Sequence, residues 1–311
     1  MHRFVPFALA LSACTTVPHP ERLQPTPDPE PFADFAAFVS TPGPIRHEAH
    51  LSARWSVARK GLIDLTDPAA AHLPADKMDI VLPVHVFEHP TAGTWVVDTG
   101  IGSELAGGGK GPLRGLVRMF LGGMEPVASL ESILAGRTPA GVLLTHTHLD
   151  HVLGLPDLGA DVPVYVGPEE GTERSIQNAL MVRTMRNTTD SALPLSSWPL
   201  SESVRLGPIA HAWDLLGDGS LWALSTPGHT AGSIAVLART QAGPVLVTGD
   251  TCHTRWGWDN GVAPGTFTEN AEENRASLRA LKGLADAVPG LVVHVGHELE
   301  AVEAGTLPDA G

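Results

Sequence analysis

The stretch LTHTHLDH at residues 144–151 places three histidines and an aspartate within six residues. It follows directly on an apolar run that is typical of a buried strand. Because side chains two residues apart on an extended segment point the same way, His146 and His148 can reach one metal ion. The chain then turns toward a helix, so Asp150 and His151 can point at a second ion nearby. The stretch therefore predicts a metal site at the end of a strand.

Three more candidate ligands lie at predicted strand ends, each beside a glycine. They are His229 in PGHT, Asp250 in TGD and His297 in VGH. Their repeated context predicts that they join the first motif at one edge of the fold. The set of five imidazoles and two carboxylates suits two Zn²⁺ ions, and iron or manganese would also fit. The seven predicted ligands are His146, His148, Asp150, His151, His229, Asp250 and His297.

The remaining pattern predicts one α/β domain over residues 45–311, with sheets covered by helices. Strand-like runs occur at residues 55–58, 80–87, 94–97, 141–145, 162–166, 221–225, 233–238, 245–248 and 291–295. Helical spacing of apolar residues occurs at residues 127–134, 168–185 and 269–287.

The N-terminus has the composition of an export signal. Residues 1–13 combine a short basic start with an apolar segment, and the letters LSAC that end at Cys14 resemble the lipobox of bacterial lipoproteins. Residues 14–44 contain eight prolines and predict an extended tether without a core. We therefore expect a lipoprotein of the bacterial cell envelope, held at the periplasmic or outer-membrane face through lipidated Cys14 alone. The alternative is a cytoplasmic protein with an apolar first segment.

Composition excludes several classes of protein. Hydrophobic residues make up 43% of the 311 residues, which is ample for a packed core. The formal charge of −14 argues against DNA or RNA as a partner. No run approaches the roughly 20 apolar residues of a membrane-spanning helix. Two cysteines rule out a disulfide scaffold, whereas fifteen histidines beside one tyrosine favour metal chemistry.

In motif order over roughly residues 80–300, the chain resembles the metallo-β-lactamase superfamily. The resemblance implies an αββα sandwich in which Asp250 bridges two zinc ions. It also implies that Asp98, in the letters VVDTG, braces the histidine loop without binding metal. One zinc would be held by His146, His148 and His229, and the other by Asp150, His151 and His297.

The implied activity is hydrolysis of a small molecule, in which a hydroxide bridging the two ions attacks a carbonyl. Asp150 would orient this hydroxide and later pass its proton to the leaving group. A lactone or ester is the expected substrate, because the layout is most similar to that of quorum-quenching acyl-homoserine lactonases. A β-lactamase, a thioesterase or a phosphodiesterase of the same fold is the alternative, and a non-catalytic metal-binding lipoprotein is less favoured.

The chain departs from the lactonases at one position. Those enzymes carry a tyrosine three residues after the bridging aspartate, where this chain has His253, and its only tyrosine is Tyr165. We expect His253 to donate a hydrogen bond to the oxyanion in place of that tyrosine. Otherwise, the substrate differs from that of the lactonases, or His253 is an ordinary loop residue that points to solvent.

Overall fold

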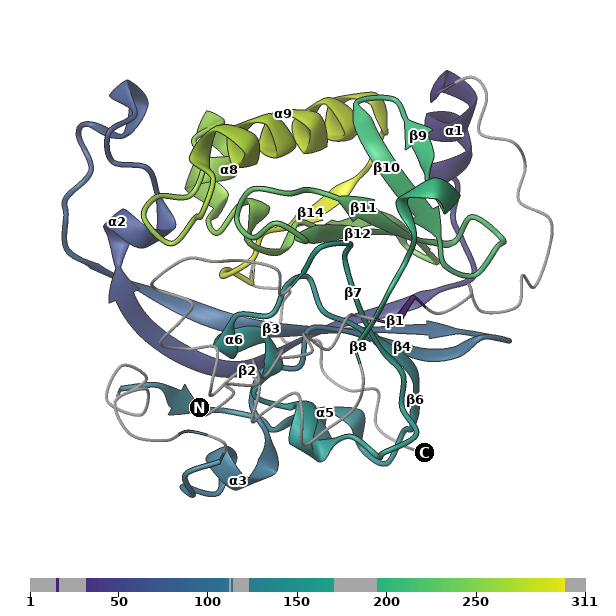
Figure 1. Cartoon of the computed structure of the whole chain (residues 1–311), viewed down its shortest axis with the longest axis horizontal. Coiled ribbons are helices and arrows are strands. Elements are labelled where there is room, and N and C mark those ends of the chain that lie inside the picture. The colour runs from purple at the N-terminus through teal and green to yellow at the C-terminus, as the bar shows by residue number, and fades with distance from the viewer. Residues whose placement is uncertain (1–14, 17–31, 112, 114–122, 171–194, 300–311) are drawn as a thin grey trace, which may run out of the picture.

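Two sheets face each other in the computed structural model, and helices cover their outer faces (Figure 1). The structure describes residues 15–16, 32–111, 113, 123–170 and 195–299. The first sheet has the strand order β1-β8-β7-β6-β4-β3-β2-β5, and the second has the order β14-β13-β12-β11-β10-β9. This arrangement confirms the expected α/β sandwich.

The strands of the first sheet are β1 (Thr15–Thr16), β2 (Arg46–Ala58), β3 (Lys77–His89), β4 (Gly93–Val97), β5 (Glu125–Pro126), β6 (Pro139–Leu143), β7 (Val164–Val166) and β8 (Leu195–Ser197). Those of the second are β9 (Val204–Leu206), β10 (Ile209–Asp214), β11 (Leu221–Ser225), β12 (Ile234–Thr240), β13 (Gly243–Val247) and β14 (Val292–His294). The described helices are α1 (Phe32–Val39), α2 (Arg59–Leu62), α3 (Ser103–Ala106), α5 (Leu130–Leu134), α6 (Leu149–Val152), α8 (Arg255–Asn260) and α9 (Ala271–Ala287), with short 3-10 turns between them.

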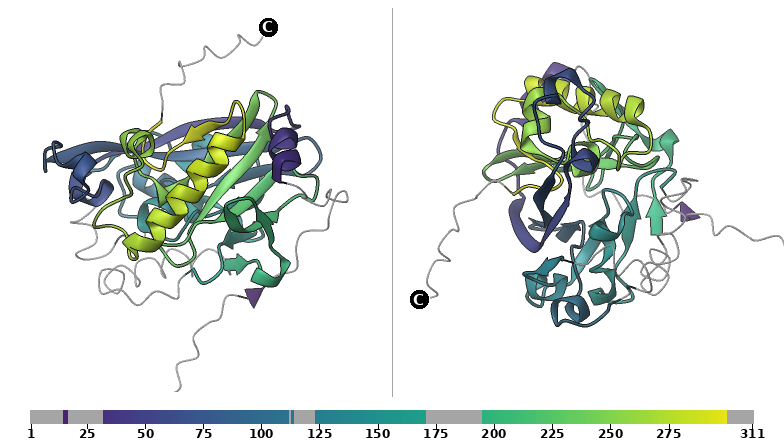
Figure 2. Two further views of the ribbon diagram at one scale, coloured as in Figure 1. Left: turned by 90° about the horizontal axis from the view of Figure 1, so that it is seen from above. Right: turned by 90° about the vertical axis from the view of Figure 1, so that its left-hand side faces the viewer.

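Alternation along the central strands divides the interior into layers. In β12, Val236 and Ala238 pack between the sheets, whereas Ala235 and Leu237 pack on the opposite side under α9. Because both faces of this strand are covered, its residues 234–238 form a continuous apolar run. Viewed from above, α9 lies over the second sheet (Figure 2).

Helix α9 starts two residues after the expected residue 269 because Asn270 caps it. The Asn270 side chain accepts a hydrogen bond from the backbone N–H of Glu273, at 3.2 Å. Two glutamates in its first turn also suit the positive end of the helix dipole. In the apolar stripe expected there, Leu278, Leu281 and Leu284 are buried and Ala285 is partly buried.

Several elements differ from the expected ranges. Strand β2 starts at Arg46, nine residues before the expected start. The mostly polar residues 46–54 (RHEAHLSAR) pair with β3 along their length. Strands β9 and β10 were not expected. The helix expected from residue 127 starts at Leu130, after the cap Ser129. Most of the helix expected at residues 168–185 lies outside the described residues.

The prediction of a coreless tether over residues 14–44 is wrong from residue 32 onward. Residues 32–39 form α1, whose Phe35, Ala36 and Val39 join the buried cluster beneath α9. The spacing i, i+1, i+4 of these three residues forms one apolar helix face, which the prolines flank without interrupting. Beyond α1, the Gly43 N–H donates to the Thr240 carbonyl at 2.9 Å. The globular domain therefore includes α1.

The predicted signal peptide and Cys14 lie outside the described residues and remain predictions. Among the helices that the structure does describe, none has the length and apolar character needed to cross a membrane.

Candidate metal centre

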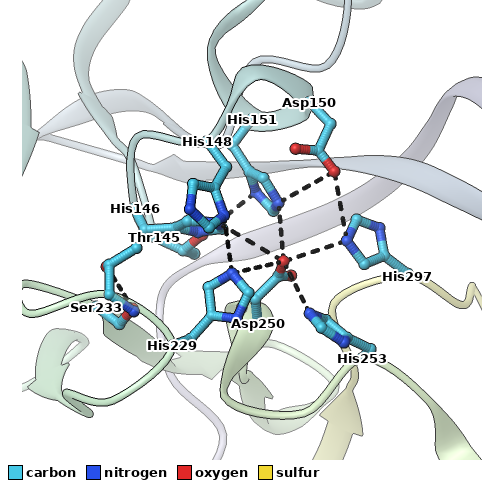
Figure 3. A network of polar contacts seen from close by, with 12 residues as sticks. Thr145, His146, His148, Asp150, His151, His229, Ser233, Asp250, His253 and His297 are labelled. Atoms are coloured by element: carbon cyan, nitrogen blue, oxygen red, sulfur yellow. Dashed lines mark hydrogen bonds and ion pairs between the residues drawn. The ribbon is translucent and has the colours of Figure 1, made fainter. Parts of the chain in front are cut away.

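The predicted ligands meet where four strand ends converge on one edge of the sandwich (Figure 3). The HTHLDH segment follows β6 of the first sheet. His229 lies in the connection between β11 and β12, Asp250 follows β13, and His297 follows β14. Both sheets therefore contribute side chains to one centre. Five of the seven predicted ligands are buried, and His148 and Asp150 are partly exposed.

One group of ligand atoms combines His146, His148, His229 and Asp250, all lying within 4.8 Å of one another. The His229 Nε2 atom lies 2.9 Å from His148 Nδ1 and 3.4 Å from Asp250 Oδ2. The His146 Nε2 atom lies 3.7 Å from the same carboxylate oxygen.

A second group combines Asp150, His151 and His297. The Asp150 Oδ2 atom lies 3.5 Å from His297 Nε2 and 3.8 Å from His151 Nε2. Asp250 Oδ2 is also 3.5 Å from His151 Nε2 and 3.3 Å from His297 Nε2. Asp250 thus faces both groups, and the structure brings together all seven predicted ligands.

Unpaired polar atoms indicate that this centre fits metal ions. The Nε2 atoms of His146 and His151 and the Oδ1 atom of Asp250 are buried without a hydrogen-bond partner among the described residues. Buried polar atoms in native proteins nearly always have partners. Imidazole nitrogens and carboxylate oxygens that converge in this way would satisfy one another around a bound cation.

Comparison with known proteins agrees with this geometry. Residues 84–297 match the metallo-beta-lactamase superfamily. The chain belongs to this superfamily. It is 25% identical over 231 residues to the N-acyl homoserine lactonase AttM of Azorhizobium caulinodans, covering 72% of this chain and 84% of that protein. It is 35% identical to a hydroxyacylglutathione hydrolase of Hahella chejuensis over 37% of this chain and 34% of that protein.

Among solved structures, a quorum-quenching N-acyl homoserine lactone lactonase shares the fold with a TM-score of 0.63 and 17% identity. The likeness covers 86% of this chain and 98% of that one. The superfamily match and the relatives confirm the expectation of a metal-dependent hydrolase.

Asp98 holds the histidine-bearing segment after β6 in place. Its Oδ2 accepts a hydrogen bond from His151 Nδ1 at 2.8 Å, and its Oδ1 accepts one from the Thr145 N–H at 2.7 Å. Because Nδ1 of His151 carries the proton, its Nε2 is left to face the centre. Asp98 therefore braces the histidine loop, as the resemblance implied.

Sequence reasoning missed Glu170, a buried carboxylate just beyond β7. Its Oε1 accepts hydrogen bonds from the backbone N–H and the hydroxyl of Thr147, both at 2.7 Å. Its Oε2 accepts one from the Thr230 hydroxyl at 2.7 Å. Thr147 lies between two ligands and Thr230 follows His229, so Glu170 joins the two loops. The only sequence signal was its place after a strand.

Two glycines allow the close approach of these loops. Gly228 has a φ of +132°, and a Cβ there would lie 2.2 Å from the Asn274 backbone nitrogen. A Cβ on Gly296 would lie 2.5 Å from Asp250 Oδ1. Any other residue at either position would displace a ligand-bearing loop.

Burial and charge set the protonation of the centre. Burial lowers the pKa of His148 to about 4 and that of His146 and His229 well below the usual value, which favours the neutral form in which imidazole can bind a metal. Burial would also lower the pKa of His151, but the carboxylates of Asp98, Asp250 and Asp150 raise it.

His253 does not point to solvent. Its ring is buried, and its Nε2 lies 3.1 Å from Asp250 Oδ2. Its Nδ1 lies 3.2 Å from the Leu62 carbonyl oxygen. The only tyrosine, Tyr165, is buried in the core and stacks on Trp198 with ring centroids 5.4 Å apart.

Proposed function

We propose that the chain is a binuclear zinc hydrolase that opens a lactone or an ester, with acyl-homoserine lactones as the first candidates. The observation that carries the proposal is the position of Asp250, whose Oδ2 faces a histidine-rich group on each side. A carboxylate shared between two ligand groups can hold two metal ions close together, which is the arrangement of a two-metal hydrolytic site.

The chemistry divides between the ions and the chain. Two bound ions would supply Lewis acidity and lower the pKa of a bound water. Asp150 is only partly buried, and its Oδ2 lies 3.5 Å from His297 Nε2. It is therefore placed at the open side of the centre, where it can hold a proton and pass it to a leaving group.

The coverage of the relatives favours a lactone over the alternatives. The match to the lactonase spans 72% of this chain. By contrast, the gamma-lactamase MBL2 of Gibberella moniliformis matches over 36% of this chain and the hydroxyacylglutathione hydrolase over 37%. The Asp at position 250 also disfavours a β-lactamase, since the resemblance implies a cysteine or serine there in enzymes of that activity.

A hydrolysis screen tests the substrate class. Zinc-loaded protein is offered lactones, esters, β-lactams, thioesters and phosphodiesters, with H148A as the matched control. We expect hydrolysis of lactones or esters that H148A lacks. Preferential turnover of another class would replace the proposed substrate, and equal rates for both proteins would contradict catalysis at this centre.

Elemental analysis of protein purified without chelator tests the two-metal proposal. We expect about two ions per chain, loss of one ion in H148A and loss of both in D250A. One ion or fewer in metal-replete wild-type protein would contradict it.

We also propose that the protein is a lipoprotein of the cell envelope. The lipobox-like letters that end at Cys14 support this location. Cys14→Ser is expected to release the protein or leave it unprocessed in cell fractionation. A wild-type protein found wholly in the cytosol would contradict it.

A further inference from the structure

His253 is built into the centre in the same way as the ligand candidate His297. The Nδ1 of each ring faces a backbone carbonyl, that of Leu62 for His253 at 3.2 Å and that of Val81 for His297 at 3.0 Å. Each Nε2 faces Asp250 Oδ2, at 3.1 Å for His253 and 3.3 Å for His297. The two ring centroids are 5.3 Å apart, and Figure 3 shows both rings directed at the same carboxylate.

The backbone carbonyls determine which nitrogen of each ring carries the proton. A carbonyl oxygen only accepts hydrogen bonds, so Nδ1 must be the protonated nitrogen of His253. With Nδ1 turned to the Leu62 carbonyl, Nε2 is the nitrogen of His253 that faces the centre. It lies 3.1 Å from Asp250 Oδ2, so one metal ion could bind both atoms.

We infer that His253 is an eighth metal ligand, which binds through Nε2 beside His297. The inference rests on the proposed two-metal centre. Its geometric basis is that ligand atoms of Asp250, His253 and His297 all lie within 4.8 Å of one another. His253 thereby places a metal ligand, and not an oxyanion donor, where the lactonases carry a tyrosine.

The backbone holds the two histidines as a pair. The His297 N–H donates to the His253 carbonyl at 2.9 Å, and the Gly296 N–H donates to the Cys252 carbonyl at 2.8 Å. These bonds connect the segment after β13 to the segment after β14. The spacing of the two rings is therefore set by the main chain, as precise metal coordination requires.

An eighth ligand makes the two metal positions unequal. The group around His146 offers four donors, one of them the shared Asp250. The group around His297 offers five when His253 and Asp250 join Asp150 and His151. Because catalytic zinc sites usually take three protein ligands, we expect the ion in this second position to bind more tightly and to leave last.

Cobalt substitution and chelator competition test the inference without relying on activity. We expect H253A to bind one of its two ions at least 10-fold more weakly than wild-type protein, with an altered cobalt absorption spectrum. H297A serves as the positive control, and H72A, which removes an exposed histidine outside the centre, serves as the negative control. Added imidazole is expected to restore part of the H253A spectrum, because it can fill the vacated position.

Three results would overturn the inference or redirect it. Wild-type affinity and spectrum in H253A would show that His253 is no ligand. If kcat also falls about 10²-fold, His253 is the oxyanion donor instead. If wild-type protein binds a single ion, the two-metal proposal fails. The affinity of H253A for that ion, compared with that of wild-type protein, still shows whether His253 is a ligand. His253→Asn retains a polar group toward Leu62 and is expected to give the same loss, which covers the case in which H253A does not fold.

Discussion

Asp250 is the residue on which the centre depends. Its carboxylate is 5% exposed, and its Oδ2 lies within 3.7 Å of the Nε2 atoms of five histidines. Burial alone would raise its pKa, but the histidines, His297 foremost, lower it well below the usual value. A buried carboxylate held in its charged form needs positive partners. The ring of histidines supplies them and holds the carboxylate in the charged form, in which it could bind a cation.

Glu170 supports the first ligand group without touching it. Glu170→Gln keeps the volume but offers an amide N–H₂ in place of one carboxylate oxygen, so one of its threonine partners loses its acceptor. Because partners behind the ligands tune metal affinity, we expect a 10- to 100-fold loss of zinc affinity, measured by chelator competition. Glu272→Gln, an exposed change on α9, is the control. Equal zinc affinity in both variants would limit Glu170 to a role in folding.

At the scale of elements, an ion-pair network joins the long strand pair β2–β3 to the segment after α5. Arg137 donates to Glu88 at 2.7 Å and to Glu48 at 3.0 Å, and its remaining guanidinium N–H groups bond the α5 carbonyls of Ile133 and Leu134. One arginine thus connects the end of a helix to two strands.

This network predicts a loss of stability in acid. Burial would raise the pKa of Glu48, but hydrogen bonds from Arg137 and His50 and the charges of Arg137 and Arg46 lower it to about 2. A lowered carboxylate pKa stabilises the fold above the unfolded value of about 4.5, and this contribution is lost as pH falls toward 2. Glu48→Gln should lower the free energy of unfolding by about 1 kcal/mol at pH 7, after allowance for partial exposure, and by almost nothing near pH 2. Urea unfolding of both proteins at the two pH values measures this loss of free energy. A loss that does not depend on pH would contradict the prediction.

Helix α1 is expected to contribute to stability although it precedes the predicted domain. Phe35 is buried and packs edge-on against Trp222 with ring centroids 5.4 Å apart. Phe35→Ala should cost about 3 kcal/mol, because it leaves a cavity in the cluster under α9. Denaturant titration measures the loss, with the exposed Ala37→Ser on the same helix as control. A cost below about 0.5 kcal/mol would mean that α1 detaches without consequence.

At the scale of the whole molecule, the ligands come from both sheets, so bound ions would link the two halves of the sandwich. Ligands that bind only the folded state stabilise it, by about 4 kcal/mol at a thousandfold excess over Kd. We expect zinc to raise the Tm of chelator-treated protein by roughly 5–10 °C in calorimetry. H72A should keep this increase and D250A should lose it. An unchanged Tm in wild-type protein would show that the centre does not couple the sheets through metal.

The local pattern of the sequence determined the candidate ligands, the strand-end glycines and helix α9. These features depend on residues a few positions apart, through the periodicity of strands and helices and through helix caps. Such short-range geometry can be predicted from the sequence. Only the tertiary structure decided the contacts of Glu170 and His253 and the docking of α1. Glu170 meets Thr230 across 60 residues and His253 meets Leu62 across 191. Contacts of this range form only when the sheets pack, because the packing places side chains together that no sequence spacing relates.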